Sequence, residues 1–207
     1  MMTIELFVSG STPTRERRAA LAERILHALT TGESAPEQVL ARARELTHVL
    51  IHTPEVWATG GPDPSTAPRY LARVTVPGSW SNTEGFGAHL IAAITEAVAA
   101  TTEPDPDRLS RDPHCLVQII GLREGNVGTL GHATSGTEIT RLITQDYHPA
   151  EDHRDVPDGH VIDPVCGMTV EWATARFTLT HDGVDYAFCA PGCRKAFAEE
   201  HSITAGG

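Results

Sequence analysis

The chain has 207 residues, and its 16 basic and 27 acidic side chains give a formal net charge of −11. About 40% of the residues are hydrophobic and 21% are charged, a composition typical of globular domains. The acidic balance argues against a nucleic-acid-binding protein, because phosphate contacts need clustered Lys and Arg. No run of 18 apolar residues predicts a membrane span, and the first residues lack the features of a signal peptide. We therefore expect a cytoplasmic protein.

The N-terminal part predicts a strand–helix–strand unit that occurs twice, in residues 2–61 and again in residues 68–131. Each copy has a short apolar strand, an amphipathic helix and a second strand. The predicted ranges are 3–8, 13–31 and 48–52 in the first copy, and 70–76, 84–100 and 115–120 in the second. A crossover of this kind joins parallel strands.

The predicted fold class is therefore α+β, with a four-stranded sheet that carries its helices on one face. We expect the other face to be apolar and bare, because Ala72, Val74 and Val76 alternate with Arg73 and Thr75. Self-association is the simplest way to bury such a face. The pattern therefore predicts a homo-oligomer.

Residues 144–160 have the composition of a linker. They contain five acidic residues, three His and two Pro, without an apolar period. The predicted organisation is therefore an N-terminal domain over 1–143, an acidic linker over 144–160 and a small C-terminal domain over 161–203.

The N-terminal part resembles the tautomerase superfamily in its fused two-unit form. The resemblance rests on the opening Thr-Ile-Glu-Leu-Phe-Val, on Trp57 with Gly60-Gly61, and on the Ala67-Pro68-Arg69-Tyr70 segment that opens the second copy. The family's chemistry uses a free N-terminal proline, whereas Met2 stands at that place and the nitrogen of Pro68 lies inside a peptide bond. We expect the proton transfer to be lost and assign no catalytic residue. The alternative is a tautomerase-family isomerase whose C-terminal domain is a structural or regulatory appendage.

Three of the four cysteines, Cys166, Cys189 and Cys193, lie near the C-terminal end. The dipeptide Asp182-Gly183 between two β-prone runs predicts a hairpin, after which Cys189 ends a strand and Cys193 begins a helix. The chain folds back between them, so that both sulfurs point at one position, and Cys166 supplies a third sulfur from a distant turn. We expect the helix N-terminus to lower the pKa of Cys193.

Residues 162–201 closely resemble the YHS domain, a small relative of the treble-clef metal-binding modules. The matching residues are Asp163-Pro164-Val165-Cys166-Gly167-Met168, then Gly183, Tyr186-Ala187-Phe188-Cys189, Cys193 and Phe197. The resemblance implies that the domain handles soft metal ions.

Three thiolates select soft cations. We expect copper(I), with zinc or mercury(II) as alternatives, and the fourth ligand stays open among His181, His201, Asp163 and Met168. The predicted function is binding of a soft heavy-metal ion by Cys166, in concert with Cys189 and Cys193, followed by storage, sensing or transfer to a partner protein.

Overall fold

The computed structural model describes residues 1–10, 13–31, 35–60 and 67–203. Contacts among its residues divide the chain into two compact units. Unit 1 comprises Met1–Thr31, Thr47–Val76 and Glu84–Gly121, and unit 2 comprises Gly32–Leu46, Pro77–Thr83 and Leu122–Gly207. No helix in the described ranges is both long and apolar enough to cross a membrane.

Unit 1 is built on a four-stranded sheet with the strand order β2-β1-β3-β4. The strands are β1 (Met2–Val8), β2 (Thr47–His52), β3 (Tyr70–Pro77) and β4 (Cys115–Leu122). β1 pairs with β2 in parallel, as the first strand–helix–strand unit predicts, and with β3 in the antiparallel sense. The predicted α+β class with a four-stranded sheet is confirmed, and the sheet is mixed.

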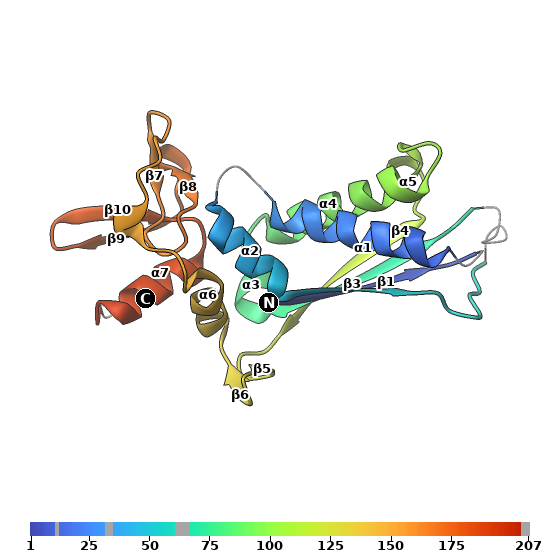
Figure 1. Ribbon diagram of the computed structural model, residues 1–207, viewed down its shortest axis with the longest axis horizontal. Coiled ribbons are helices and arrows are strands. Elements are labelled where there is room, and N and C mark those ends of the chain that lie inside the picture. Colours follow the sequence, from blue (N-terminus) through green and yellow to red (C-terminus); the bar gives the residue numbers. More distant parts are fainter. Residues whose placement is uncertain (11–12, 32–34, 61–66, 204–207) are drawn as a thin grey trace. The chain divides into compact units, whose positions relative to one another are not determined.

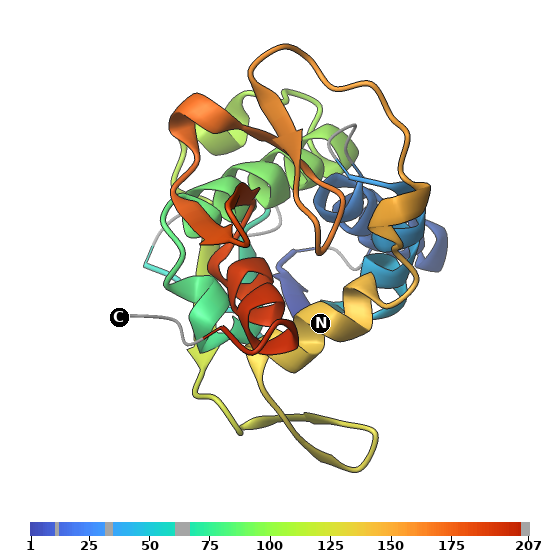
Figure 2. The same ribbon diagram turned by 90° about the vertical axis from the view of Figure 1, so that its left-hand side faces the viewer.

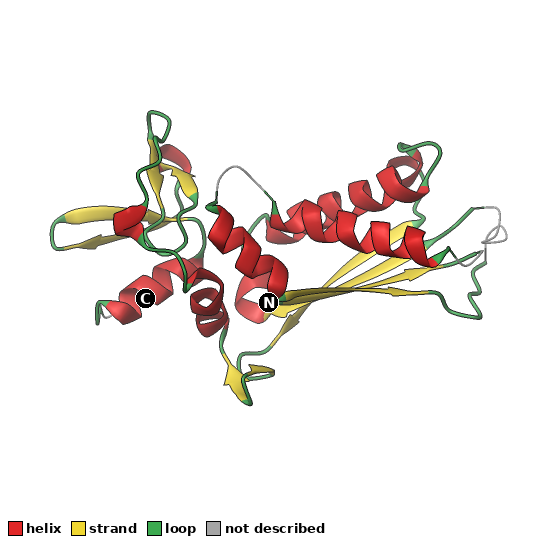
Figure 3. Cartoon of the chain, in the orientation of Figure 1, coloured by secondary structure: helices red, strands yellow, loops and turns green. Residues whose placement is uncertain are grey.

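Two long helices, α1 (Arg15–Thr30) and α4 (Phe86–Thr102), pack against each other over the same face of this sheet, as predicted (Figures 1 and 3). The hydroxyl of Thr14 caps α1 by accepting a hydrogen bond from the amide of Arg17. A short helix, α5 (Arg108–Arg111), precedes β4. The buried helix residues include Leu21, Ile25, Leu90 and Ile94, which recur at the spacing of one helical face.

The prediction that Ala72, Val74 and Val76 belong to a bare apolar face is wrong. All three are buried and therefore form the alternate row that packs toward the helices. The opposite row of β3 contains the exposed Arg73, whose guanidinium lies 5.4 Å from the ring centroid of Phe7 on β1. The more apolar row of the strand packs against the helices. The side chains left on the open face are therefore mixed in polarity.

Unit 2 consists of short elements gathered from three parts of the chain. They are α2 (Glu37–Glu45), α3 (Gly78–Ser81), β5 (Val127–Thr129), β6 (His132–Thr134), α6 (Gly136–Thr144), a 3-10 turn (Pro149–Glu151), β7 (His160–Ile162), β8 (Thr169–Glu171), a second 3-10 turn (Trp172–Thr174), β9 (Phe177–His181), β10 (Val184–Phe188) and α7 (Pro191–Glu200). The strands form three antiparallel hairpins, β5–β6, β7–β8 and β9–β10. The hairpin predicted around Asp182-Gly183 is confirmed, and both turn residues have positive φ.

Helices α6 and α7 pack side by side within unit 2 (Figure 2), and α2 packs on α6. One core cluster joins Val39 of α2, Tyr147, the two cysteines Cys166 and Cys193, and the aromatic pair Phe188 and Phe197. Tyr147 belongs to the segment that the sequence analysis interprets as a solvated linker, yet only 6% of its surface is exposed. The predicted domain boundaries stay a prediction, but the contacts of the described residues group the chain differently.

Candidate metal centre

A tight turn between β7 and β8 carries Cys166. The turn closes through two backbone hydrogen bonds, from the amide of Asp163 to the carbonyl of Met168 (2.9 Å) and from the amide of Gly167 to the carbonyl of Asp163 (2.8 Å). Gly167 adopts φ +72°, a conformation that L side chains rarely allow. The turn buries Cys166, which is 4% exposed.

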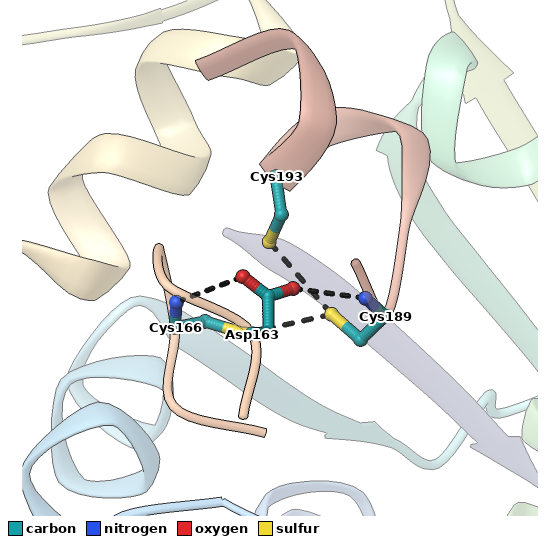
Figure 4. A group of neighbouring side chains, drawn as sticks. All are labelled: Asp163, Cys166, Cys189 and Cys193. Carbon is teal, nitrogen blue, oxygen red and sulfur yellow. Dashed lines mark hydrogen bonds between the residues drawn. The ribbon is translucent and has the colours of Figure 1, made fainter. Parts of the chain in front are cut away.

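The other two cysteines flank the connection from β10 to α7. Cys189 follows the last residue of β10, and Cys193 is the third residue of α7, which begins at Pro191. Pro at the first position of a helix is well tolerated because its missing N–H needs no partner there. This connection reverses the chain, so that both thiols face the turn that holds Cys166 (Figure 4).

The three sulfurs form a compact group. The Sγ atom of Cys189 lies 3.5 Å from that of Cys166 and 3.7 Å from that of Cys193. A carboxylate oxygen of Asp163 belongs to the same group, in which all four ligand atoms lie within 4.8 Å of one another. As whole residues, Cys166 and Cys193 are buried and Cys189 is half-buried, and all three thiols are shielded from solvent.

Asp163 holds the two cysteine-bearing segments together. Its Oδ1 atom accepts hydrogen bonds from the amides of Val165 (2.8 Å) and Cys166 (3.4 Å), and its Oδ2 atom accepts one from the amide of Cys189 (2.8 Å). The residue is completely buried. Burial, followed by the nearby charge of Cys166, raises the pKa of Asp163 to about 7. A carboxylate braced in this way orients the ligands in addition to being a candidate ligand itself.

One of the three thiols is the preferred site of negative charge. The pKa of Cys166 is lowered because the thiols of Cys189 and Cys193 donate hydrogen bonds to its sulfur. The pKa values of Cys189 and Cys193 are raised, chiefly because each of them is the donor to Cys166. The prediction that the helix N-terminus lowers the pKa of Cys193 is therefore wrong. The neighbouring sulfurs dominate, because at these distances only one of three thiols ionises readily.

Of the four side chains that the sequence analysis considers as a fourth ligand, the structure brings Asp163 to the cluster. His181 and His201 instead pack around Phe197, with their ring centroids 4.9 Å apart. Met168 packs against the core cluster. The fourth cysteine, Cys115 of β4, belongs to unit 1, and burial raises the pKa of its thiol, which lowers the thiolate fraction available for metal binding or attack.

Unit 1 contains a separate cavity of about 530 Å³ near the end of β1. Its walls include Arg17, Tyr70 and Glu103. The Tyr70 hydroxyl donates to Glu103 (2.7 Å), and Arg108 holds the same carboxylate with two hydrogen bonds, of 2.5 and 2.7 Å. Burial raises the pKa of Tyr70. Neither Glu103 nor Arg108 was predicted as a functional residue, because a pair spaced five residues apart follows no familiar motif.

No protein-family model matches the chain, and a search of curated proteins found no match. Among solved structures, the chain is similar to Pt0534 inactivated by 2-oxo-3-pentynoate, with 19% identity over 64% of this chain and 95% of that chain and a TM-score of 0.49. It is also similar to a fused 4-OT asymmetric trimer (19%; 63% and 94%; TM-score 0.47) and to a macrophage migration inhibitory factor-like protein from Entamoeba histolytica (14%; 64% and 97%; TM-score 0.45).

These proteins belong to the superfamily that the N-terminal sequence resembles. At such TM-scores the likeness carries no conclusion about activity, and the family of this chain stays a prediction.

Proposed function

We propose that the protein binds a thiophilic metal ion through Cys166, Cys189 and Cys193. The observation that carries the proposal is the convergence of three sulfurs and one carboxylate, all within 4.8 Å of one another, from segments 26 residues apart. Without a cation the charges of neighbouring thiolates repel one another, so only one of the three thiols ionises readily. A bound cation removes that conflict by stabilising all of the thiolates at once.

The spacing of the sulfurs is close to what a tetrahedral ion requires. With metal–sulfur bonds of about 2.3 Å, a tetrahedral ion holds its sulfurs about 3.8 Å apart, and a planar three-coordinate ion with similar bonds holds them about 4.0 Å apart. The distances of 3.5 and 3.7 Å around Cys189 are nearer to the tetrahedral value. Asp163 is placed to complete a four-coordinate site.

Two ions therefore compete as the natural ligand. Copper(I), the ion expected from the sequence, is favoured by a donor set of three sulfurs. Zinc is favoured by the tetrahedral spacing and by the carboxylate of Asp163, since zinc accepts both sulfur and oxygen ligands. Mercury(II) would use the sulfurs alone.

The direct test is metal loading of the full chain under reducing, anaerobic conditions, with zinc(II) and copper(I) each supplied in competition with a chelator of known affinity. We expect one ion per chain for the wild type and less than a tenth of that for Cys189→Ser combined with Cys193→Ser. Cys115→Ser is the matched control and should bind as the wild type does. Equal loading of the double variant and the wild type would overturn the proposal.

Self-association through unit 1 is the second part of the proposal. Two large apolar side chains of the edge strand β4, Leu116 and Ile120, are 56% and 39% exposed, and Leu50 of the other edge strand, β2, is 46% exposed. Exposed apolar side chains that lie near one another mark candidate contact surfaces. Sedimentation velocity of the full chain tests this part. We expect an oligomer that dissociates when Leu116 and Ile120 are replaced by Asn, and a monomeric wild type would refute it.

The cavity of unit 1 supports one alternative function, enol–keto isomerisation of a small molecule by a tautomerase-like fold. Its volume of about 530 Å³ falls in the range of small-molecule sites. An assay with an aryl pyruvate tests it. Activity above the buffer rate that persists when Cys189 and Cys193 are both replaced by Ser, and that falls in Tyr70→Phe, would support the alternative. The buffer rate alone would exclude it for this substrate class.

A further inference from the structure

A segment outside the C-terminal cysteine motif is attached to the turn that carries Cys166. The guanidinium of Arg154 donates a hydrogen bond from Nη2 to the carbonyl oxygen of Gly167, the residue after Cys166. Arg154 lies in the range that the sequence analysis interprets as an acidic linker. Its contact therefore connects that range directly to the metal-binding turn.

Arg154 is itself held in a fixed position. The Oδ1 atom of Asp152 accepts a hydrogen bond from the Nε atom of Arg154 (2.9 Å), and Oδ2 accepts one from Nη2 (2.7 Å). A two-point contact of this kind fixes the plane of a guanidinium. Asp152 in turn accepts a hydrogen bond from the hydroxyl of Tyr147 (3.0 Å). The side chain of Asp152 is 6% exposed, and the hydrogen bonds from Arg154 lower its pKa even though burial opposes the shift. Asp152 thus stays an anion over the physiological range.

The same segment closes over the turn by packing. The ring of Tyr147 lies so close to Gly167 that a Cβ atom there would be 2.6 Å from the Cε2 atom of Tyr147 and 2.5 Å from the Cγ atom of Pro36. Tyr147 also shares the core cluster with Cys166 and Cys193. The turn therefore rests on an aromatic ring on one side and is hydrogen-bonded to a guanidinium through its carbonyl.

Charge supplies a second reason for Arg154 to be there. The candidate metal centre gathers three thiols and a carboxylate in a chain of net charge −11. With all three thiolates formed, the site keeps a negative charge even with a divalent ion bound. The guanidinium of Arg154 contacts the residue after Cys166 and interacts favourably with the charge of the Cys166 thiolate.

We infer that Arg154 is a positioning residue for the metal centre: clamped by Asp152 and Tyr147, it holds the Gly167 carbonyl so that the Cys166 sulfur faces Cys189, and it offsets the negative charge of the thiolates. The inference rests on the proposed metal binding. It makes residues 147–154 part of the metal centre. The 161–203 region alone is then expected to bind its ion more weakly than the full chain does.

The test compares the metal affinity of the full chain in four forms: the wild type, Arg154→Ala, Asp152→Asn and Arg141→Ala. Arg141→Ala is the matched control, because Arg141 is also half-exposed in unit 2 and pairs with an acidic residue, Glu199, but has no contact with the turn in the hydrogen bonds described. Affinities are measured with zinc(II) and copper(I) against a competing chelator. Loss of a group that orients a metal ligand typically costs about 10–100-fold in affinity, so we expect Arg154→Ala to bind at least 10-fold more weakly and Arg141→Ala within twofold of the wild type.

Cobalt(II) provides a readout that general destabilisation would not change. The intensity of its sulfur-to-metal charge-transfer band follows the number of thiolates bound per ion. We expect three in the wild type and in Arg141→Ala, and an intensity reduced by about a third in Arg154→Ala, because Cys166 is no longer aimed at the ion. Arg154→Lys, which restores the charge without the two-point contact, should recover part of the affinity.

The outcomes separate the two proposals. A wild type that binds none of the three metals overturns the proposed function itself. A wild type that binds, together with an Arg154→Ala variant that matches Arg141→Ala in affinity and band intensity, overturns this inference and leaves the proposed function intact. If Arg154→Ala does not fold, Asp152→Asn decides, since it loosens the clamp while keeping every side-chain volume. Wild-type affinity and band intensity in Asp152→Asn would then overturn the inference.

Discussion

Replacing Gly167 by Ala tests how closely the turn that carries Cys166 is packed. Two costs add at this position. The left-handed backbone conformation at φ +72° costs about 1–2 kcal/mol for a residue with a Cβ atom. The added methyl group would also lie 2.5 Å from Pro36 and 2.6 Å from Tyr147, and overpacking of this kind costs about 1–3 kcal/mol. We therefore expect unit 2 to lose about 2–5 kcal/mol of stability.

Gly183→Ala is the matched control for this change. Gly183 has nearly the same conformation, φ +76°, but a Cβ atom there would meet nothing within 4 Å. The Gly183→Ala variant should therefore lose only about 1–2 kcal/mol of stability, from the backbone conformation alone. Urea unfolding of both variants, followed by circular dichroism, measures the difference, which corresponds to roughly 1 M in the midpoint for a typical slope. Equal midpoints would refute the close packing of the turn against Tyr147, and with it the structural basis for the Arg154 inference.

Two further predictions concern pH and the buried ion pair of unit 1. Cys189 and Cys193 have raised pKa values and are protonated at neutral pH, so each bound ion must displace at least two protons, and affinity should rise by at least about 100-fold per pH unit around neutral pH. Chelator competition at several pH values measures this slope, and a flat profile would contradict it. Glu103→Gln should destabilise unit 1 by about 3–5 kcal/mol, because it leaves the largely buried guanidinium of Arg108 without its carboxylate partner. The control, Glu96→Gln on the exposed side of α4, should change stability by less than about 0.5 kcal/mol. Although burial opposes the shift, hydrogen bonding from Arg108 lowers the pKa of Glu103. The stabilisation by the Glu103–Arg108 pair is therefore fully present above the ordinary Glu pKa and is lost as the pH falls through the lowered pKa of Glu103. Thermal unfolding of both variants across this range checks the sign, and a Glu103→Gln variant as stable as Glu96→Gln would refute the role of the pair.

Local signals in the sequence predict much of the fold. Apolar periodicity predicts both long helices and all four strands of unit 1 to within a few residues, because these elements bury a regular row of side chains. The hairpin around Asp182-Gly183 follows from its turn residues alone. A capping box also marks the start of α6, since Ser135 and Glu138 exchange hydrogen bonds with each other's backbone amides. Helix α6 is thus marked by its capping residues and not by an apolar period, and it was not predicted.

Other features carry no local signal. Helix α2 buries only Val39 among its nine residues, so its apolar pattern is too sparse to show where it packs. Tyr147 and Asp152 lie in a range rich in acidic residues and Pro, which has the composition of a linker. Their burial depends on contacts with Gly167 and Arg154. Composition describes a segment on average and does not reveal that one aromatic ring in it belongs to a core.

The spacing of Cys189 and Cys193 around a strand end and a helix start is a local property, and so the sequence by itself determined that these two sulfurs could converge. It also determined the mixed α and β character of the chain, since helix and strand periods differ along it. Only the tertiary structure decided that Asp163 braces both cysteine segments, that the pKa of Cys166 is lowered while those of Cys189 and Cys193 are raised, and that Arg154 contacts the turn. Each of these depends on distances between residues far apart in the chain, and hydrogen bonds and charge interactions change steeply with distance.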